Sequence, residues 1–161
     1  FQPRATAHRF AVAFPPGPLW VRADERKVAM SLHNLLDNAV NYSPQGGEIR
    51  VEAIALPPGM VQVTVGDQGI GIPAAELEKV FERFYRLDNS DARRVYGSGL
   101  GLYVAKKLIE AQGGRIWAES RVGVGSKLIF TLPRAKVKEE RGRTLGSKAR
   151  PRAAPGTGRR A

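Results

Sequence analysis

Alternation of apolar and polar residues predicts five strands in this chain. The first alternating stretch stops at Pro15-Pro16-Gly17-Pro18, which is typical of an edge strand followed by a turn. Two further pairs of alternating segments are each separated by a short turn that contains glycine, so each pair predicts a β-hairpin. The predicted strands are residues 9–14, 48–56, 60–66, 115–120 and 126–132.

Apolar residues recur at helical spacing in two longer segments. Asp24 is suited to cap a helix that runs to about Tyr42. A second helix is predicted over residues 99–112, closed by Gly113-Gly114, and a short helix is predicted near residues 74–79. The apolar stripe of the first helix is Val28, Leu32, Leu35, Leu36 and Ala39.

The order of these elements favours an α+β fold. Strands and helices alternate irregularly and two hairpins are present, so a mixed sheet with helices on one face is favoured over a doubly wound parallel sheet. The segment from Gln68 to Tyr96 is polar and weakly periodic. A loop of this length inside a domain is typical of a lid or of disorder.

The positive charge is concentrated at the C-terminal end. The net charge is +11, but residues 134–161 hold ten Lys and Arg against two Glu, a net of +8, which leaves +3 for residues 1–133. We therefore predict one domain at residues 1–133 and a disordered basic tail at residues 134–161. We favour a solvated tail over an RNA- or membrane-binding arm, and we expect no nucleic-acid partner.

Composition excludes several other classes of site and protein. The chain has no Cys and only two His, which excludes a disulfide framework and a thiolate or zinc cluster. No apolar run approaches the roughly 20 residues of a membrane helix. The chain begins at Phe1 without a signal-like segment, which indicates a fragment of a longer protein.

Several amides share one face of the first predicted helix. Asn34 and Asn38 are four residues apart, and Asn41 and Tyr42 continue that face one turn later. Amides lower helix propensity and need partners when buried, so their clustering indicates a polar ligand. An amide oxygen would ligate magnesium without adding negative charge beside phosphates. A solvated polar face explains this helix equally well when it is considered alone.

Asp67 lies where a predicted strand ends and a glycine turn begins. Its ionised carboxylate only accepts hydrogen bonds, so it would accept from the N6 amino group of adenine and repel O6 of guanine. Gly69 and Gly71 would permit positive φ or a close approach to a flat ring, and Ile70 and Ile72 would supply apolar walls. Taken alone, the segment is better explained as a structural turn.

A glycine-rich segment, Gly97-Ser98-Gly99-Leu100-Gly101-Leu102, opens the last predicted helix. Free backbone N–H groups at the start of a helix bind phosphate. No apolar strand precedes the segment, which argues against a dinucleotide fingerprint, and no Gly-Lys-Ser/Thr follows, which excludes a P-loop. Protein-kinase signatures are also absent.

The order of four segments carries more information than any one of them. Residues 34–43, 67–73, 81–86 and 97–102 resemble the N, G1, F and G2 boxes of the catalytic ATP-binding domain of sensor histidine kinases. The resemblance covers roughly residues 8–133. It implies the two-layer α/β sandwich of the histidine kinase and gyrase-type ATPase superfamily, with ATP and Mg²⁺ held between the N-box helix and a mobile lid.

The resemblance also implies a role for individual residues. Asn38 would be the principal Mg²⁺ ligand, and Asn34 would support the metal, water or phosphates. Tyr42 would pack on the adenine, and Asp67 would accept a hydrogen bond from N6. The G1 glycines would lie beside the base and the G2 glycines at the phosphates. The expected ATP-binding residues are Asn34, Asn38, Asn41, Tyr42, Asp67, Gly69, Gly71, Ile72, Arg83, Arg86, Gly97, Ser98, Gly99, Leu100, Gly101 and Leu102.

One position departs from the family pattern. The family usually has a basic residue before the aromatic residue of the N box, where this chain has Asn41. A cation there would neutralise phosphate charge, and Asn41 does not supply that contact. Arg83, Arg86, Arg93 and Arg94 are candidates, because guanidinium groups pair bidentately with phosphate, although each is equally well explained as a solvated side chain.

No residue of this chain resembles the phosphoacceptor histidine. His8 precedes the edge strand and His33 neighbours Asn34, and we expect both to be structural. The resemblance implies a helical dimerisation and phosphoacceptor domain outside this chain, with Phe81 and Phe84 anchoring the lid or contacting that domain. It also implies that the full-length kinase is a homodimer with a response regulator as its partner. This domain would be cytoplasmic, and a membrane anchor upstream of it is compatible with the resemblance.

Two other functions remain open. The first is an anti-sigma-type serine kinase or an ATPase of the same superfamily, although clamp ATPases usually carry a catalytic glutamate where this chain has Asn34. The second is a non-catalytic nucleotide-sensing module, and Asn41 is the observation in its favour. We expect the chain to bind Mg-ATP and to transfer little phosphate without its helical partner.

Overall fold

The structure, a computed structural model, describes residues 8–87 and 98–136 and contains one mixed sheet. The strand order is β1-β2-β3-β5-β4, in which β1 pairs parallel with β2 and all other pairs are antiparallel. The edge position of the first strand and both predicted hairpins are therefore confirmed. The strands are β1 (His8–Ala13), β2 (Gly47–Leu56), β3 (Met60–Gly66), β4 (Arg115–Arg121) and β5 (Gly125–Pro133).

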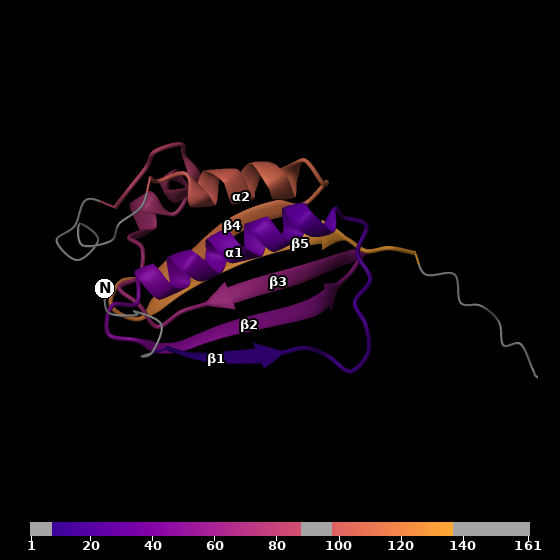
Figure 1. Ribbon diagram of the computed structural model, residues 1–161, viewed down its shortest axis with the longest axis horizontal. Helices are drawn as coiled ribbons and strands as arrows, with labels where there is room; N and C mark the ends of the chain where they lie inside the picture. Colours follow the sequence, from indigo (N-terminus) through magenta and orange to yellow (C-terminus); the bar gives the residue numbers. More distant parts are fainter. Residues whose placement is uncertain (1–7, 88–97, 137–161) are drawn as a thin grey trace, which may run out of the picture.

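Two helices, α1 (Glu25–Asn41) and α2 (Gly101–Glu110), lie on one face of the sheet (Figure 1). The predicted cap of α1 is confirmed, because the Asp24 side chain accepts a hydrogen bond from the Lys27 N–H at 3.1 Å. The two-layer arrangement predicted from the order of the elements is thus present.

Two helix predictions need correction. The last helix begins at Gly101 rather than residue 99 and ends at Glu110 rather than residue 112, because the chain turns back there with the Gly114 N–H donating to the Ile109 carbonyl. The helix predicted near residues 74–79 is instead two separate 3₁₀ turns, at Ala74–Glu76 and Lys79–Phe81. Neither turn is long enough to form a regular α-helix.

The core lies between the two helices and the sheet. Leu35 of α1, Ile109 of α2, and Ile49 and Val65 of the sheet are each 0% exposed. In the predicted stripe of α1, Leu35 and Ala39 are fully buried, and the remaining three residues pack against the core while partly buried. Burial of this stripe leaves Asn34 and Asn38, on another side of α1, free to line the cleft described below.

The domain continues slightly beyond Pro133. Arg134 forms an antiparallel bridge with Val21, and the Ala135 N–H donates to the Trp20 carbonyl at 2.9 Å. The first residues of the segment predicted as a tail therefore pair with the loop before α1. The remainder of that segment, residues 137–161, lies outside the described residues. No helix within the described part of the chain has the length and apolarity to cross a membrane.

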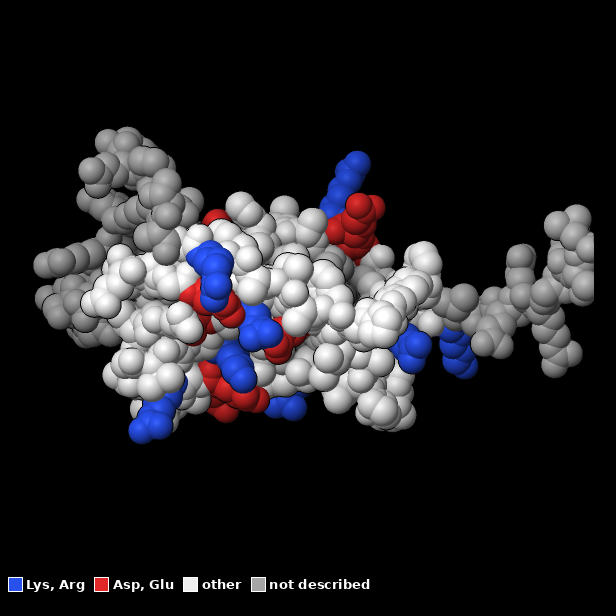
Figure 2. Space-filling view, turned by 90° about the horizontal axis from the view of Figure 1, so that it is seen from below, with Lys and Arg blue, Asp and Glu red and all other residues white. Residues whose placement is uncertain are grey.

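Charges of both signs lie beside one another on the face seen from below in Figure 2. Arg9 of β1 pairs with Glu48 of β2, and Arg50 pairs with Glu52 at 2.9 Å along β2. Such exposed pairs contribute little to stability. Their mixed sign on this face is consistent with the net charge of only +3 counted for residues 1–133.

Candidate nucleotide-binding site

A cleft of about 260 Å³ opens between α1, the turn after β3 and the start of α2. This volume is several times the roughly 30 Å³ that one water molecule occupies in the liquid, so the cleft has room for a ligand. The lining residues that the sequence predicted as ATP-binding are Asn34, Asn38, Asn41, Tyr42, Asp67, Gly71, Ile72, Arg86, Ser98, Gly99, Gly101 and Leu102.

Four predicted residues are not placed in the cleft. Gly69, Arg83 and Leu100 are not among its described lining residues, and Gly97 lies outside the described part of the chain. Gly69 and Leu100 belong to the backbone that shapes the cleft, as described below. The predicted segments therefore converge on one place even though not every residue faces it.

The amides of α1 lie directly against the start of α2. The Asn38 Nδ2 group donates to the Asn34 carbonyl at 2.8 Å, which leaves the Asn38 Oδ1 atom as an acceptor or ligand. A Cβ atom placed on Gly101 would lie only 3.5 Å from Asn34 Oδ1. An amide oxygen thus lies beside the start of a helix, and these are groups that would hold a magnesium ion and phosphates.

The start of α2 leaves its first backbone N–H groups without a side-chain cap. Leu100 occupies the N-cap position and makes no side-chain cap hydrogen bond, and the first turn holds no acidic residue. In contrast, α1 is capped by Asp24. Since Ser98, Gly99 and Gly101 line the cleft at this point, the helix end faces the cavity and is available to an anion.

Gly99 fixes this segment to the region around Phe84. Its φ is +68°, and a Cβ atom there would lie 2.8 Å from the Phe84 carbonyl carbon. The Phe84 N–H donates to the Gly99 carbonyl at 3.0 Å, and Phe84 itself adopts a φ of +64°. The two predicted boxes therefore touch through their backbones, at a position where only glycine fits.

Asp67 is held by two backbone groups at one of its oxygens. Its Oδ1 atom accepts from the Gly69 N–H at 2.8 Å and from the Ser126 N–H at 3.2 Å. Burial raises the pKa of the Asp67 carboxyl, and the two N–H donors partly oppose that rise. Because Oδ1 is occupied in this way, Oδ2 is the oxygen left for a ligand in the cleft.

The turn that follows Asp67 packs against the end of α1. The Ile70 N–H donates to the Tyr42 carbonyl at 3.0 Å, and a Cβ atom on Gly69 would lie 2.1 Å from that same carbonyl oxygen. Gly69 is therefore required for contact with the helix end. Gly71 has a φ of +75° and lines the cleft. The positive φ that the sequence predicted for one or both of these glycines is therefore present at Gly71.

Gly69→Ala should lower the free energy of unfolding by about 1–3 kcal/mol, because the added methyl group meets backbone that cannot rotate away. Gly66→Ala is the matched control, since its Cβ atom would have its nearest neighbour at 3.8 Å and its stability should change by less than about 0.5 kcal/mol. Denaturant unfolding of the two variants measures the difference. Equal stability of both variants would contradict this account of the turn.

Arg86 is the one cation among the described residues that line the cleft. Burial raises the pKa of the Tyr42 hydroxyl, and the positive charge of Arg86 opposes that rise. The positive charge of Arg86 thus acts at Tyr42 on this side of the cleft. Arg83 instead stacks over the Phe84 ring, 4.7 Å from its centroid, and Arg93 and Arg94 lie outside the described residues.

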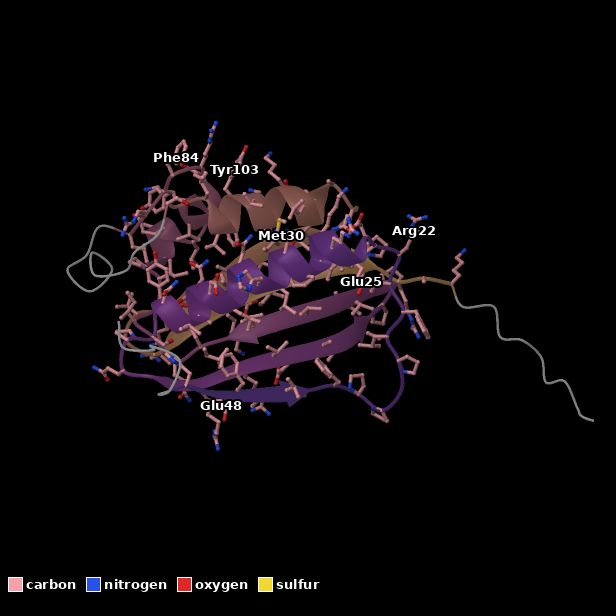
Figure 3. The ribbon with its side chains drawn as sticks, in the orientation of Figure 1. Arg22, Glu25, Met30, Glu48, Phe84 and Tyr103 are labelled. Atoms are coloured by element: carbon pink, nitrogen blue, oxygen red, sulfur yellow. The ribbon has the colours of Figure 1, made fainter. Side chains whose placement is uncertain are left out.

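The two phenylalanines of the predicted F box differ in environment. Phe81 is 4% exposed and belongs to the core, whereas Phe84 is 59% exposed. Figure 3 shows Phe84 and Tyr103 of α2 on the same outer side of the molecule. Phe81 therefore anchors the segment, and Phe84 is left on the surface.

Both histidines make contacts that suit structural residues. The His8 Nε2 group donates to the Ser43 carbonyl at 3.0 Å, tying β1 to the end of α1. His33 lies 3.2 Å from the Asp37 carboxylate, one turn along the exposed side of α1. His8 is therefore engaged within the fold, whereas His33 and its partner lie on the exposed side of α1.

Sequence reasoning missed part of the lining. Asp37 lies between Asn34 and Asn38 on α1, and the helical spacing that selected the two amides would also have found it. The other missed residues come from segments whose neighbours depend on the tertiary fold. The missed residues are Asp37, Val80, Tyr85, Leu87, Ser126 and Leu128.

Comparison with known proteins agrees with this geometry. Residues 23–136 match the family described as Histidine kinase-, DNA gyrase B-, and HSP90-like ATPase. The chain is 41% identical over 127 residues to the sensor histidine kinase WalK of Bacillus subtilis (strain 168), which covers 78% of this chain and 21% of WalK. The chain therefore spans about a fifth of that relative.

Two solved structures share the fold. The mycobacterial sensor histidine kinase MprB superposes with a TM-score of 0.70 at 32% identity, covering 81% of this chain and 85% of that one. Full-length ShkA in complex with AMPPNP gives a TM-score of 0.72 at 30% identity, covering 82% of this chain and 27% of ShkA. Since the family match runs from the cap of α1 through the cleft to the end of β5, the chain belongs to the histidine kinase-, DNA gyrase B- and HSP90-like ATPases.

Proposed function

We propose that this chain is the ATP-binding catalytic domain of a sensor histidine kinase. The observation that carries the proposal is the convergence of three features on one cleft: the oxygen of Asn38, the carboxylate of Asp67 and the uncapped start of α2. They are suited to a metal ion, an amino-bearing base and phosphates respectively. The complex of ShkA with AMPPNP supports a nucleotide as the ligand of such a fold.

Each part of the nucleotide has a proposed partner. Asp67 Oδ2 accepts from the adenine amino group, and Tyr42 packs on the base. Asn38 ligates Mg²⁺ with Asn34 in support, and the backbone at the start of α2 holds the phosphates. Arg86 supplies the positive charge that Asn41 lacks, because it lines the cleft and its charge acts on Tyr42.

Phosphate transfer requires a second domain. In the proposed reaction an imidazole nitrogen of the acceptor bonds to the γ-phosphorus, the bond from that phosphorus to the β–γ bridging oxygen breaks, and ADP leaves. Bound magnesium would neutralise charge on the β- and γ-phosphate oxygens. The residues of this chain position the triphosphate, which is the main contribution that such transfer demands from the protein.

A surface near the cleft is suited to receive that second domain. Phe84 is exposed and carries Arg83 over its ring, and Tyr103 carries Lys107 at 5.7 Å from its ring centroid (Figure 3). Exposed aromatic residues with adjacent cations are typical of protein contact sites. We propose that the helical phosphoacceptor domain docks there.

Proposals about the full-length protein are based on the sensor kinases to which this chain is similar. We propose that the full protein is a homodimeric sensor kinase in which this domain is cytoplasmic and which serves a response regulator. A non-catalytic nucleotide-sensing module is the second candidate, favoured by Asn41 at a position that is usually basic in the family.

Mixing this chain with a separately produced helical hairpin that carries the acceptor histidine should yield acid-labile phosphohistidine on the hairpin in the presence of Mg-ATP. Incorporation of radiolabelled γ-phosphate measures it, and a hairpin with the histidine replaced by alanine is the control. Tight ATP binding with no transfer to either hairpin would instead favour the sensing module.

The affinity for ATP should fall as the pH is lowered and the Asp67 carboxylate becomes protonated. Because the pKa of Asp67 is raised, this fall should occur at a higher pH than the protonation of an exposed aspartate. Oδ1 already accepts two N–H groups, so the proton would settle on Oδ2 and replace the acceptor that adenine needs. Unfolding stability without nucleotide should move the opposite way, because the buried charge destabilises the folded state above this pKa and is neutralised below it.

Calorimetric titration with ATP over a series of pH values tests this sign. Asp67→Asn removes the titrating group and should remove this component of the pH dependence, whereas protonation of ATP itself affects both proteins. An identical pH dependence in both proteins would exclude Asp67 as its source.

A further inference from the structure

The β4–β5 hairpin wraps around the turn that presents Asp67. The Gly123 N–H donates to the Ile70 carbonyl at 2.8 Å, and the Asp67 N–H donates to the Ser126 carbonyl at 2.8 Å. The hairpin and the turn are therefore joined at several backbone positions, although some fifty residues separate them in the sequence.

One side chain beside the turn of this hairpin, Ser120, uses its whole hydrogen-bonding capacity on the contact. Its Oγ atom accepts from the Ile72 N–H at 2.7 Å, donates to the Gly125 carbonyl at 2.8 Å, and lies 3.0 Å from the Ser126 hydroxyl. A serine hydroxyl has one proton and two lone pairs, so with Ser126 donating to it the group is fully satisfied.

Ser120 is connected to Asp67 through one intervening residue, Ser126. The backbone N–H of Ser126 donates to Asp67 Oδ1, and Ile72 ends the turn that begins at Asp67. Ser120 thus contacts both ends of the segment, at Ile72 directly and at Asp67 through Ser126. Ser120 is not among the described residues that line the cleft, but it lines a second hollow that also touches Asp67 and Ser126.

Close backbone packing leaves this unit little freedom to adjust. A Cβ atom on Gly71 would lie 2.3 Å from the Arg121 carbonyl oxygen, and one on Gly125 would lie 2.0 Å from the Asp67 carbonyl oxygen. When two backbones are this close, the loss of a hydrogen bond between them is relieved by a shift of the turn as a whole rather than by a side-chain rotation.

We propose that Ser120 is a positioning residue that sets the location of Asp67 relative to the adenine, and through it the selectivity for an amino-bearing purine. This role rests on the proposed function of the cleft as an ATP site. Ser120 touches no nucleotide in this account, and it acts through Ile72 and Ser126.

Ser120→Ala should weaken ATP binding about tenfold, because it leaves the partly buried Ile72 N–H without its acceptor and shifts the turn. Binding of purine riboside triphosphate, which lacks the exocyclic amino group, should weaken by less than about twofold, since this ligand makes no use of Asp67 Oδ2. The measurement is calorimetric affinity for both nucleotides with magnesium, together with the melting temperature of each protein.

Three further variants distinguish positioning from mere stabilisation. Ser120→Thr keeps the hydroxyl and should retain the preference of the natural chain for ATP. Ser120→Cys has a side chain of similar size but a weaker hydrogen-bond acceptor, so it should reduce the preference for ATP over purine riboside triphosphate. This variant provides a second measurement if Ser120→Ala does not fold. Ser31→Ala is the matched control, because the hydroxyl of this fully buried serine donates to the Lys27 carbonyl within α1, and the variant should leave the preference for ATP unchanged.

Loss of affinity for both nucleotides by the same factor in Ser120→Ala or Ser120→Cys would overturn the positioning role and leave a purely structural serine. Failure of the natural chain to bind ATP would overturn the proposed function itself, and the role of Ser120 with it. The two failures are distinguished by the titration of the natural chain, which precedes the variants.

Discussion

Asn38→Ala should reduce the affinity for ATP in the presence of magnesium by about 100-fold, the upper end of the effects seen when groups around a bound metal are removed. The Asn38 Nδ2 group is committed to the Asn34 carbonyl, so the side chain is oriented with its oxygen available to the metal. Alanine removes this ligand. The Asn34 carbonyl loses the side-chain donor but keeps its backbone hydrogen bond within the helix. Affinity for ATP in excess chelator should differ much less between the two proteins.

Asn38→Asp tests the same ligand in another way. A carboxylate keeps an oxygen for the metal, but it places negative charge against the Asn34 carbonyl, which lies 2.8 Å from the amide nitrogen it replaces. It also adds charge beside the phosphates, so ATP affinity should again fall. Gln45→Ala, which removes an exposed amide that does not line the cleft, is the control. Unchanged affinity in both Asn38 variants would exclude Asn38 as the metal ligand.

Asp67→Asn should erode the preference for ATP over GTP by about 100-fold, since a site that loses its matched polar partner discriminates far less between ligands. The direction follows from the two N–H groups that donate to Oδ1. The amide must keep its oxygen at that position, which places Nδ2 where Oδ2 faced the cleft. An N–H₂ group there repels the adenine amino group and can donate to O6 of guanine.

Affinities for ATP and GTP measured by calorimetry give the change in preference. Asp37→Asn is the matched control, because Asp37 is a second carboxylate of the same cleft but pairs with His33 on α1. That variant should retain the preference for ATP over GTP. Full discrimination in Asp67→Asn would count against the assignment of Asp67 to the base.

Features encoded by neighbouring residues were predictable from the sequence. Asp24 caps α1 because the capping geometry is local, and the stripe that includes Leu35 and Ala39 follows the period of a single helix. The hairpin of β2 and β3 likewise follows from alternation on both sides of one turn. These elements bring the Asn38 amide and Asp67 to the two sides of the cleft.

Features that depend on distant backbone could not be predicted in this way. The Ile72 N–H bonds to Ser120, 48 residues away, and nothing in the local pattern of either segment indicates this pair. The requirement for glycine at position 69 arises from the Tyr42 carbonyl, which only the folded chain brings close. Local propensity also overestimated the length of the helix near Ala74, where the chain forms separate 3₁₀ turns.

A crystal structure of this chain with Mg²⁺ and a non-hydrolysable ATP analogue tests the central claim most directly. We expect the adenine amino group within hydrogen-bonding distance of Asp67 Oδ2, the metal on Asn38 Oδ1, and the phosphates at the start of α2. A nucleotide bound in the cleft with its base away from Asp67, or its metal held without Asn38, would contradict the account.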